Sequence, residues 1–211
     1  MQRWIRLFMI SMMVLIVQAC DNNVIRYEPL GQNAKVLAFG DSITLGYGVG
    51  AQESYPYVLS ELSGWQVINA GIVGEMAETA NNRIDAAMVQ HQPKLVLIEL
   101  GGNDFLNNVE DSAVKENLRR IIRRVKRHNA IPVLIAIPAL SSSMTVTTNI
   151  EDSPIYADLA REEEINVVPD VFSMLLRTPR YKKDLVHPNG EGYRVLGEAI
   201  YLQLHGMGLV H

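Results

Sequence analysis

The chain has 211 residues, of which 48% are hydrophobic and 20% charged, a composition typical of a globular protein with a sizeable core. Its net charge of −4 and the absence of a basic arm argue against nucleic acid as a partner. A single cysteine excludes an internal disulfide and a cysteine-rich metal site.

The first twenty residues have the order of a secretory signal rather than of a folded element. Arg3 and Arg6 precede an apolar run over 7–17, and small residues then lead to Cys20. The run has about 11 residues, too few to cross a bilayer at ~1.5 Å per residue. We therefore expect a signal peptide over 1–19.

The end of this segment, "VQAC", resembles a bacterial lipobox. The resemblance implies that Cys20 becomes the lipidated first residue of an exported lipoprotein, tethered to a membrane at the periplasm or cell envelope. Soluble export and an uncleaved anchor are the alternatives. We expect residues 20–33 to form a polar tether and residues 34–211 to form the folded domain.

Five short, nearly continuous apolar runs predict strands that are buried on both faces. Helical patterns lie between several of them, and this alternation favours an α/β fold with a parallel sheet between two helical layers. The predicted strands cover 35–39, 65–70, 94–100, 131–137 and 165–170, and the helical patterns cover 53–62, 75–92, 110–128 and 188–204.

The helical pattern over 110–128 carries an apolar stripe at helical spacing and a strongly basic opposite face. A binding face for anionic membranes or nucleic acid is one interpretation. We favour a solvated face whose cations suit a helix C-terminus. The stripe consists of Val114, Leu118, Ile121, Ile122 and Val125, and the basic face of Arg119, Arg120, Arg123, Arg124, Lys126 and Arg127.

In a parallel sheet of this kind ligands bind at the carboxyl ends of the strands, so the residues that follow each run matter most. Ser42 follows the first run in "GDSIT", and a serine hydroxyl needs a base within hydrogen-bond reach. His187 is the best candidate, because it stands in the polar stretch "YKKDLVHPNG". Asp184, three residues earlier, can orient its imidazole.

A serine that attacks a carbonyl also needs hydrogen-bond donors for the negative charge that develops. Three candidates follow the first three runs: the N–H of Ser42, the N–H of Gly74 and the side-chain amide of Asn103. Asp41 and Asp104 stand beside them, and we expect both to brace their loops by accepting backbone hydrogen bonds.

In this order, "GDSIT", "NAGIVGE", "ELGGND" and "DLVHPN" resemble the motifs of the GDSL, or SGNH, hydrolases, and the likeness covers about residues 34–205. The periplasmic thioesterase and lysophospholipase branch and the arylesterases are the most similar. The resemblance implies a flavodoxin-like three-layer αβα fold with five parallel strands. It also implies a Ser42–His187–Asp184 triad and an oxyanion hole from Ser42, Gly74 and Asn103, without cofactor.

The resemblance further implies that the substrate is a small-molecule ester or thioester, with short or medium acyl esters and lysophospholipids as candidates. Segment 138–153 is the expected lip of the acyl pocket. A carbohydrate or peptidoglycan O-acetylesterase, a non-catalytic acyl- or glycan-binding envelope protein and an acyltransferase are the alternatives. The remaining histidines form no ligand cluster, so we predict no catalytic metal.

Overall fold

A computed structural model describes residues 24–140 and 150–211 of the chain. Its centre is one sheet of five parallel strands in the order β2-β1-β3-β4-β5. This is the doubly wound, flavodoxin-like order, so the predicted fold class is confirmed. The strands are β1 (Lys35–Gly40), β2 (Gln66–Gly71), β3 (Leu95–Glu99), β4 (Ile131–Ile135) and β5 (Asn166–Val168).

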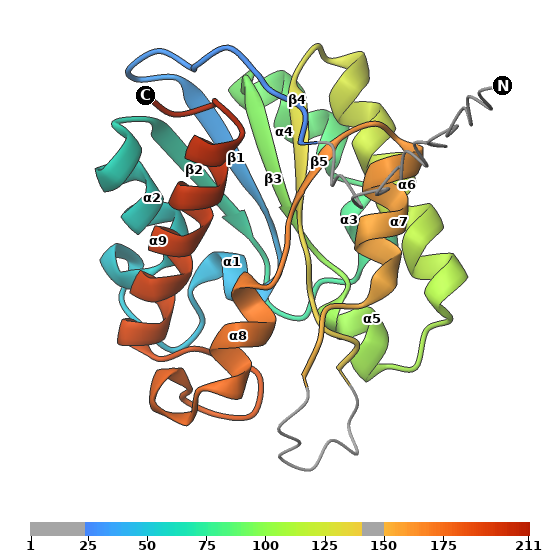
Figure 1. Cartoon of the computed structure of the whole chain (residues 1–211). Helices are drawn as coiled ribbons and strands as arrows, with labels where there is room; N and C mark the ends of the chain where they lie inside the picture. Colours follow the sequence, from blue (N-terminus) through green and yellow to red (C-terminus); the bar gives the residue numbers. More distant parts are fainter. Residues whose placement is uncertain (1–23, 141–149) are drawn as a thin grey trace, which may run out of the picture.

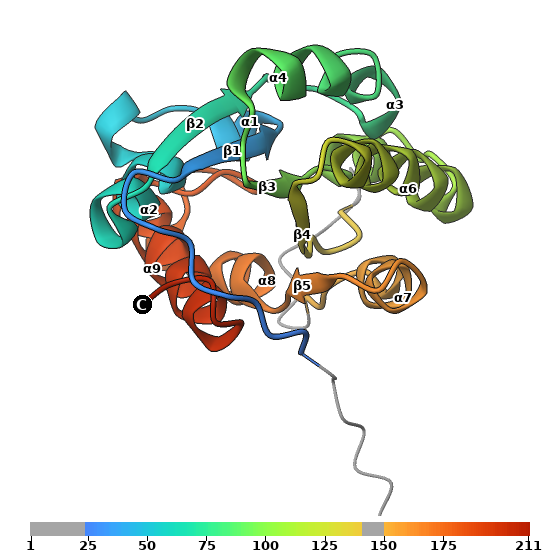
Figure 2. The same ribbon diagram turned by 90° about the horizontal axis from the view of Figure 1, so that it is seen from above.

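Helices cover both faces of the sheet, as right-handed crossovers require. Figure 2 shows α2 (Tyr55–Ser63), α8 (Val171–Arg177) and α9 (Gly190–Gly206) on one face. The other face is covered by α3 (Ala77–Ala80), α4 (Ile84–His91), α6 (Asp111–Arg127) and α7 (Pro154–Glu162). The remaining elements are α1 (Ser42–Leu45), η1 (Ala51–Glu53), α5 (Gly102–Leu106) and η2 (Pro179–Tyr181).

The helical pattern over 75–92 forms two helices instead of one. A turn at 81–83 separates α3 from α4. The Asn81 side-chain amide donates to the carbonyl of Ala77 at 2.9 Å and to that of Asn117 at 3.1 Å, so it ties the turn to α6. The single-helix expectation fails because the local hydrogen bond to Ala77 and the tertiary one to Asn117 compete with continued helix.

The long helix α6 has the predicted apolar stripe, and all five of its residues are buried. We expected its basic face to be solvated, but several of the basic side chains form ion pairs with α7 and the residue that follows it. Arg119 lies 2.9 Å from Glu162 and 3.2 Å from Glu163, and Arg123 lies 2.8 Å from Glu163. The acidic end of α7 therefore neutralises much of this face.

Residues 24–33 differ from the free tether that the sequence suggests. Ile25 exchanges two hydrogen bonds with the Asn166 side chain, of 2.9 and 2.7 Å. The N–H groups of Tyr27 and Leu30 donate to carbonyls near the C-terminus, and both side chains pack against the core. Figure 1 shows this segment crossing the sheet beside the C-terminus. Apolar packing thus attaches it to the domain.

The expected signal peptide and Cys20 lie outside the described residues, as does most of the expected acyl-pocket lip. Among the residues that the structure describes, no helix is both long enough and apolar enough to cross a bilayer.

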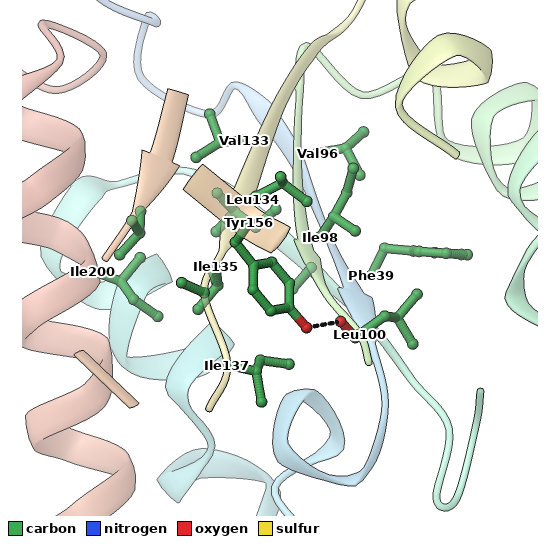
Figure 3. Packing of buried hydrophobic residues seen from close by; sticks show 14 of the residues in the cluster. Phe39, Val96, Ile98, Leu100, Val133, Leu134, Ile135, Ile137, Tyr156 and Ile200 are labelled. Atoms are coloured by element: carbon green, nitrogen blue, oxygen red, sulfur yellow. Dashed lines mark hydrogen bonds between the residues drawn. The ribbon is translucent and has the colours of Figure 1, made fainter. Parts of the chain in front are cut away.

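The core between β3, β4 and α7 shapes the start of the candidate site. Figure 3 shows the Tyr156 hydroxyl donating to the carbonyl of Leu100, at 2.8 Å, where β3 ends. Gly101 follows with a φ of 122°, and a Cβ at this position would collide with the same hydroxyl. Only glycine fits this turn, which directs α5 and Asn103 toward the end of β1.

Candidate active site

Ser42 lies at the carboxyl end of β1 as the first residue of α1. Asp41 caps this short helix, since its carboxylate accepts the N–H of Ile43 at 2.9 Å. The cap orients Ser42 so that its Oγ lies 3.1 Å from Nε2 of His187, 145 residues further along the chain. A hydroxyl and an imidazole are thus in hydrogen-bond contact at the predicted edge of the sheet.

Asp184 holds the other side of the same imidazole. Its two carboxylate oxygens lie 2.9 and 3.0 Å from Nδ1 of His187. Oδ1 also accepts the backbone N–H of Val186 at 3.0 Å and of His187 at 2.8 Å. Partial burial raises the pKa of Asp184, but these hydrogen bonds outweigh it and hold the pKa below its usual value. The group is therefore an anion suited to stabilise an imidazolium.

Tyr47 also contacts this imidazole, and the sequence reading gave it no role. Its ring centroid lies 4.7 Å from that of His187, with the two planes tilted by 44°. The N–H of Tyr47 donates to the carbonyl of Ser42 at 2.9 Å, which connects its position to that of the serine. In the sequence, the glycine–tyrosine pair at 46–47, shortly after the serine motif, could have indicated this contact.

The N–H groups of Ser42 and Gly74 engage in no hydrogen bond between residues of the described ranges. Gly74 has a φ of 74°, and a side chain at this position would meet no atom within 4 Å. The backbone is therefore open to close approach on this side, as a donor to a bound oxygen must be.

Asn103 presents its amide from α5 next to the serine loop. Its Nδ2 donates to Oδ2 of Asp41 at 2.9 Å and to the carbonyl of Glu75 at 3.1 Å. Asp104 accepts the N–H of Ala77 at 2.9 Å. Asp41 and Asp104 thus each accept a backbone hydrogen bond, as predicted, and Asp41 also fixes the orientation of the Asn103 amide.

Glu99, for which the sequence predicts no role, lies buried at the end of β3 in contact with α1. Its Oε2 accepts the N–H and the hydroxyl of Thr44 at 3.1 and 2.7 Å, so it anchors α1 to β3. Burial, together with the charge of Asp41, raises the pKa of Glu99 well above its usual value, and burial raises the pKa of Asp41 to about 7. In the sequence, a carboxylate at the end of an otherwise apolar predicted strand could have indicated this buried role.

Both raised pKa values imply that the folded state binds protons that the unfolded state has released. The resulting stability is fully present below about pH 4 and is lost as the pH rises through about 7. Glu99→Gln keeps an acceptor for Thr44 and removes one titrating group. Because the raised pKa of Glu99 contributes to this pH dependence, we expect the variant to lose less unfolding free energy between pH 5 and pH 8 than the unaltered chain.

Urea denaturation of both proteins at the two pH values measures this effect. Glu61→Gln, on the exposed side of α2, is the control and should keep the pH dependence of the unaltered chain. An equally steep loss of stability in Glu99→Gln would mean that Glu99 does not contribute to this pH dependence.

Exposed apolar side chains stand near these groups in the chain. Leu45 follows Ser42 in α1, Ile72 and Val73 precede Gly74, and Leu185 lies between Asp184 and His187; all four are exposed. Exposed aliphatic side chains on the segments that carry these polar groups are compatible with the binding of a partly apolar molecule.

A hollow of about 380 Å³ lies elsewhere, at the starts of β3 and β4. The Ser42–His187 pair lies at the opposite edge of the sheet, so this hollow takes no part in the arrangement. Within residues 24–140 and 150–211, no three His, Cys, Asp or Glu side chains gather as metal ligands would.

Residues 38–195 match the model of the GDSL-like lipase/acylhydrolase family. Thioesterase 1/protease 1/lysophospholipase L1 of Escherichia coli K12 is 33% identical over 174 residues, which cover 80% of this chain and 82% of that protein. An arylesterase of Vibrio mimicus is 28% identical over 176 residues, covering 81% and 88%.

The crystal structure of the psychrotrophic esterase EstA from Pseudoalteromonas sp. superimposes with a TM-score of 0.70. The match has 23% sequence identity and covers 82% of this chain and 97% of that one. At this identity the likeness concerns the fold, which is the same three-layer arrangement.

Proposed function

The chain belongs to the GDSL-like lipase/acylhydrolase family, whose model matches most of its length, and is a carboxylic ester hydrolase of this class; from this premise we propose that Ser42 is its nucleophile. His187 takes the proton of the Ser42 hydroxyl as Oγ attacks the acyl carbonyl, and Asp184 stabilises the imidazolium. The observation that carries the proposal is the 3.1 Å contact between Ser42 Oγ and His187 Nε2, on an imidazole held by Asp184.

The attack forms an Oγ–C bond and moves the carbonyl electron pair onto oxygen. We assign the N–H groups of Ser42 and Gly74 and the Asn103 amide to this oxyanion. When the tetrahedral intermediate collapses, His187 gives its proton to the departing alcohol or thiol. Water then attacks the acyl-enzyme, His187 takes a proton from it, and Ser42 leaves with that proton as the acid is released.

The substrate class that we propose is an ester or thioester with a short or medium acyl chain, lysophospholipids included. The exposed Leu45, Ile72, Val73 and Leu185 on the segments that carry the polar groups support it, because aliphatic side chains suit an acyl chain better than a sugar ring. An O-acetylesterase acting on glycans is the second candidate, and its only specific support is the expected address in the cell envelope.

Hydrolysis across a series of p-nitrophenyl esters, acyl thioesters, a lysophospholipid and an acetylated glycan tests this choice. We expect kcat/KM to rise from the acetyl to the butyryl or hexanoyl ester, since each buried methylene contributes about 0.8 kcal/mol. Activity on the acetylated glycan alone would favour the second candidate. If the folded protein hydrolyses none of these substrates and does not react with a fluorophosphonate probe, the binding-protein alternative is favoured. Efficient transfer of the acyl group to added alcohols would favour an acyltransferase.

We also propose that the chain is exported and carries lipid on Cys20, a role supported by the lipobox-like "VQAC" and the charged and apolar segments before it. Bacterial cells that express the full chain should incorporate labelled palmitate into it. Cys20→Ala should abolish this label, and persistence of the label would exclude Cys20 as the modified residue.

A further inference from the structure

An ion pair between Arg83 and Glu75 lies beside the Gly74 turn and takes no part in the proposed proton transfers. Nε of Arg83 donates to Oε1 of Glu75 at 2.7 Å, and its Nη2 contacts the other carboxylate oxygen. The Arg83 side chain is 23% exposed and that of Glu75 only 6%. A largely buried ion pair of this kind contributes little net stability, because desolvation of both charges offsets their attraction.

Arg83 connects this ion pair to two strands. Its Nη2 donates to the carbonyl of Ala70 at 2.9 Å and lies 3.3 Å from that of Gly40, and its guanidinium lies 4.0 Å from the Phe39 ring centroid. Gly40 precedes the serine loop and Ala70 precedes the Gly74 turn. One planar guanidinium therefore joins the ends of β1 and β2 to Glu75, which the single ammonium of lysine could not do.

Glu75 in turn touches the groups assigned to the oxyanion. It follows Gly74 directly, and its own N–H closes the turn by donating to the carbonyl of Ile72 at 3.2 Å. Its carbonyl accepts from the Asn103 amide at 3.1 Å. The position of this one residue thus determines where Gly74 and Asn103 stand relative to each other.

We propose that the Arg83–Glu75 ion pair is a positioning device, which holds the Gly74 N–H and the Asn103 amide in register with Ser42. The inference rests on the proposed function, because it concerns the donors assigned to the oxyanion. Donors stabilise a transition state only when they are fixed before the charge develops. Arg83 and Glu75 act through these donors, and their side chains have no part in the proton transfers.

The test compares Glu75→Gln with Glu163→Gln in the full chain. Glu163 is the matched control, because it forms a similarly buried ion pair with Arg119 at 3.2 Å, with side-chain exposures of 18% for Arg119 and 8% for Glu163. Arg119 lies on α6 and Glu163 directly follows α7, and neither element carries a residue of the candidate site. Both variants should lose some thermal stability. Only Glu75→Gln should lose kcat, by about 10- to 100-fold, less than the complete removal of a donor would cost. Its KM should change less than about threefold, as when an interaction made only in the transition state is weakened.

A trifluoromethyl ketone, which forms a tetrahedral oxyanion with an active serine, gives an independent measurement. Its affinity for Glu75→Gln should fall by the same factor as kcat/KM, and that for Glu163→Gln should not change. Arg83→Lys keeps the charge and should show the same pattern, so the test does not depend on one variant. All assays are run well below the melting temperature of each variant.

Retention of kcat within about threefold in a folded Glu75→Gln or Arg83→Lys variant would overturn the inference, as would an equal loss in Glu163→Gln or a change confined to KM. Failure of the proposed function would look different, since Ser42→Ala would then stay active. An inactive Ser42→Ala together with a fully active Glu75→Gln rejects the positioning role alone.

Discussion

Replacing Ser42 by alanine should reduce the hydrolysis of p-nitrophenyl butyrate to the background rate, a loss on the order of 10⁴–10⁶-fold in kcat. The change removes a single oxygen atom at a position that is 7% exposed, so the fold should remain intact. The proposed nucleophile is lost while the groups assigned to the oxyanion stay in place. Stopped assays with purified protein and circular dichroism of the same samples measure both effects.

Two further variants make this result specific. Ser63→Ala removes a hydroxyl that donates to the Leu59 carbonyl in α2, and its activity should remain unchanged. His187→Ala should be about as inactive as Ser42→Ala, and the double variant no worse, because the two groups act as one unit. A folded Ser42→Ala protein that keeps a few per cent of the activity would remove Ser42 from its assigned role.

Asn103→Ala should lower kcat by about 10²–10³-fold, the cost of one lost oxyanion donor. The Asp41 carboxylate and the Glu75 carbonyl fix the amide plane in advance. An oxyanion that forms beside Nδ2 can then accept one of the two Nδ2 hydrogens, which it shares with the present acceptor in a three-centre hydrogen bond. Because this bond forms with the transition state, KM should change little, and steady-state kinetics on one ester separates the two effects.

Asn107→Ala is the control for this substitution. Asn107 follows α5, is exposed, and donates its side-chain amide to the carbonyl of Asn103 at 2.8 Å, so it shares the neighbourhood but not the assigned role. Its kcat should stay within about twofold of the unaltered chain. A kcat within threefold for Asn103→Ala would exclude this amide from the oxyanion hole.

The sequence predicts most of this fold because its signals are local. The apolar runs that became β1 to β5 and the stripe on α6 are visible within windows of about a dozen residues. The break between α3 and α4 is not, since Asn81 leaves the helical pattern through a hydrogen bond to Asn117 on another helix. The docking of residues 24–33 is hidden from the sequence for the same reason: Ile25 bonds to Asn166, and Tyr27 and Leu30 bond to carbonyls near the C-terminus.

The candidate site divides in a similar way. Ser42, Asn103 and His187 could be selected because each is a polar residue shortly after a buried strand or in a polar stretch before a helix. Glu99 and Arg83 could not, although both support the same loops. The sequence contains many charged residues, and only packing distinguishes a carboxylate buried against α1 from one on the surface.

By itself, the sequence determined which chemical groups stand at the carboxyl edge of the sheet, because alternating apolar runs and helices permit few topologies and place strand ends together. Only the tertiary structure decided that Ser42 Oγ meets His187 Nε2 at 3.1 Å, and that Arg83 joins Glu75 to the ends of two strands. Such contacts join residues that periodicity does not relate, and each depends on how every intervening element packs.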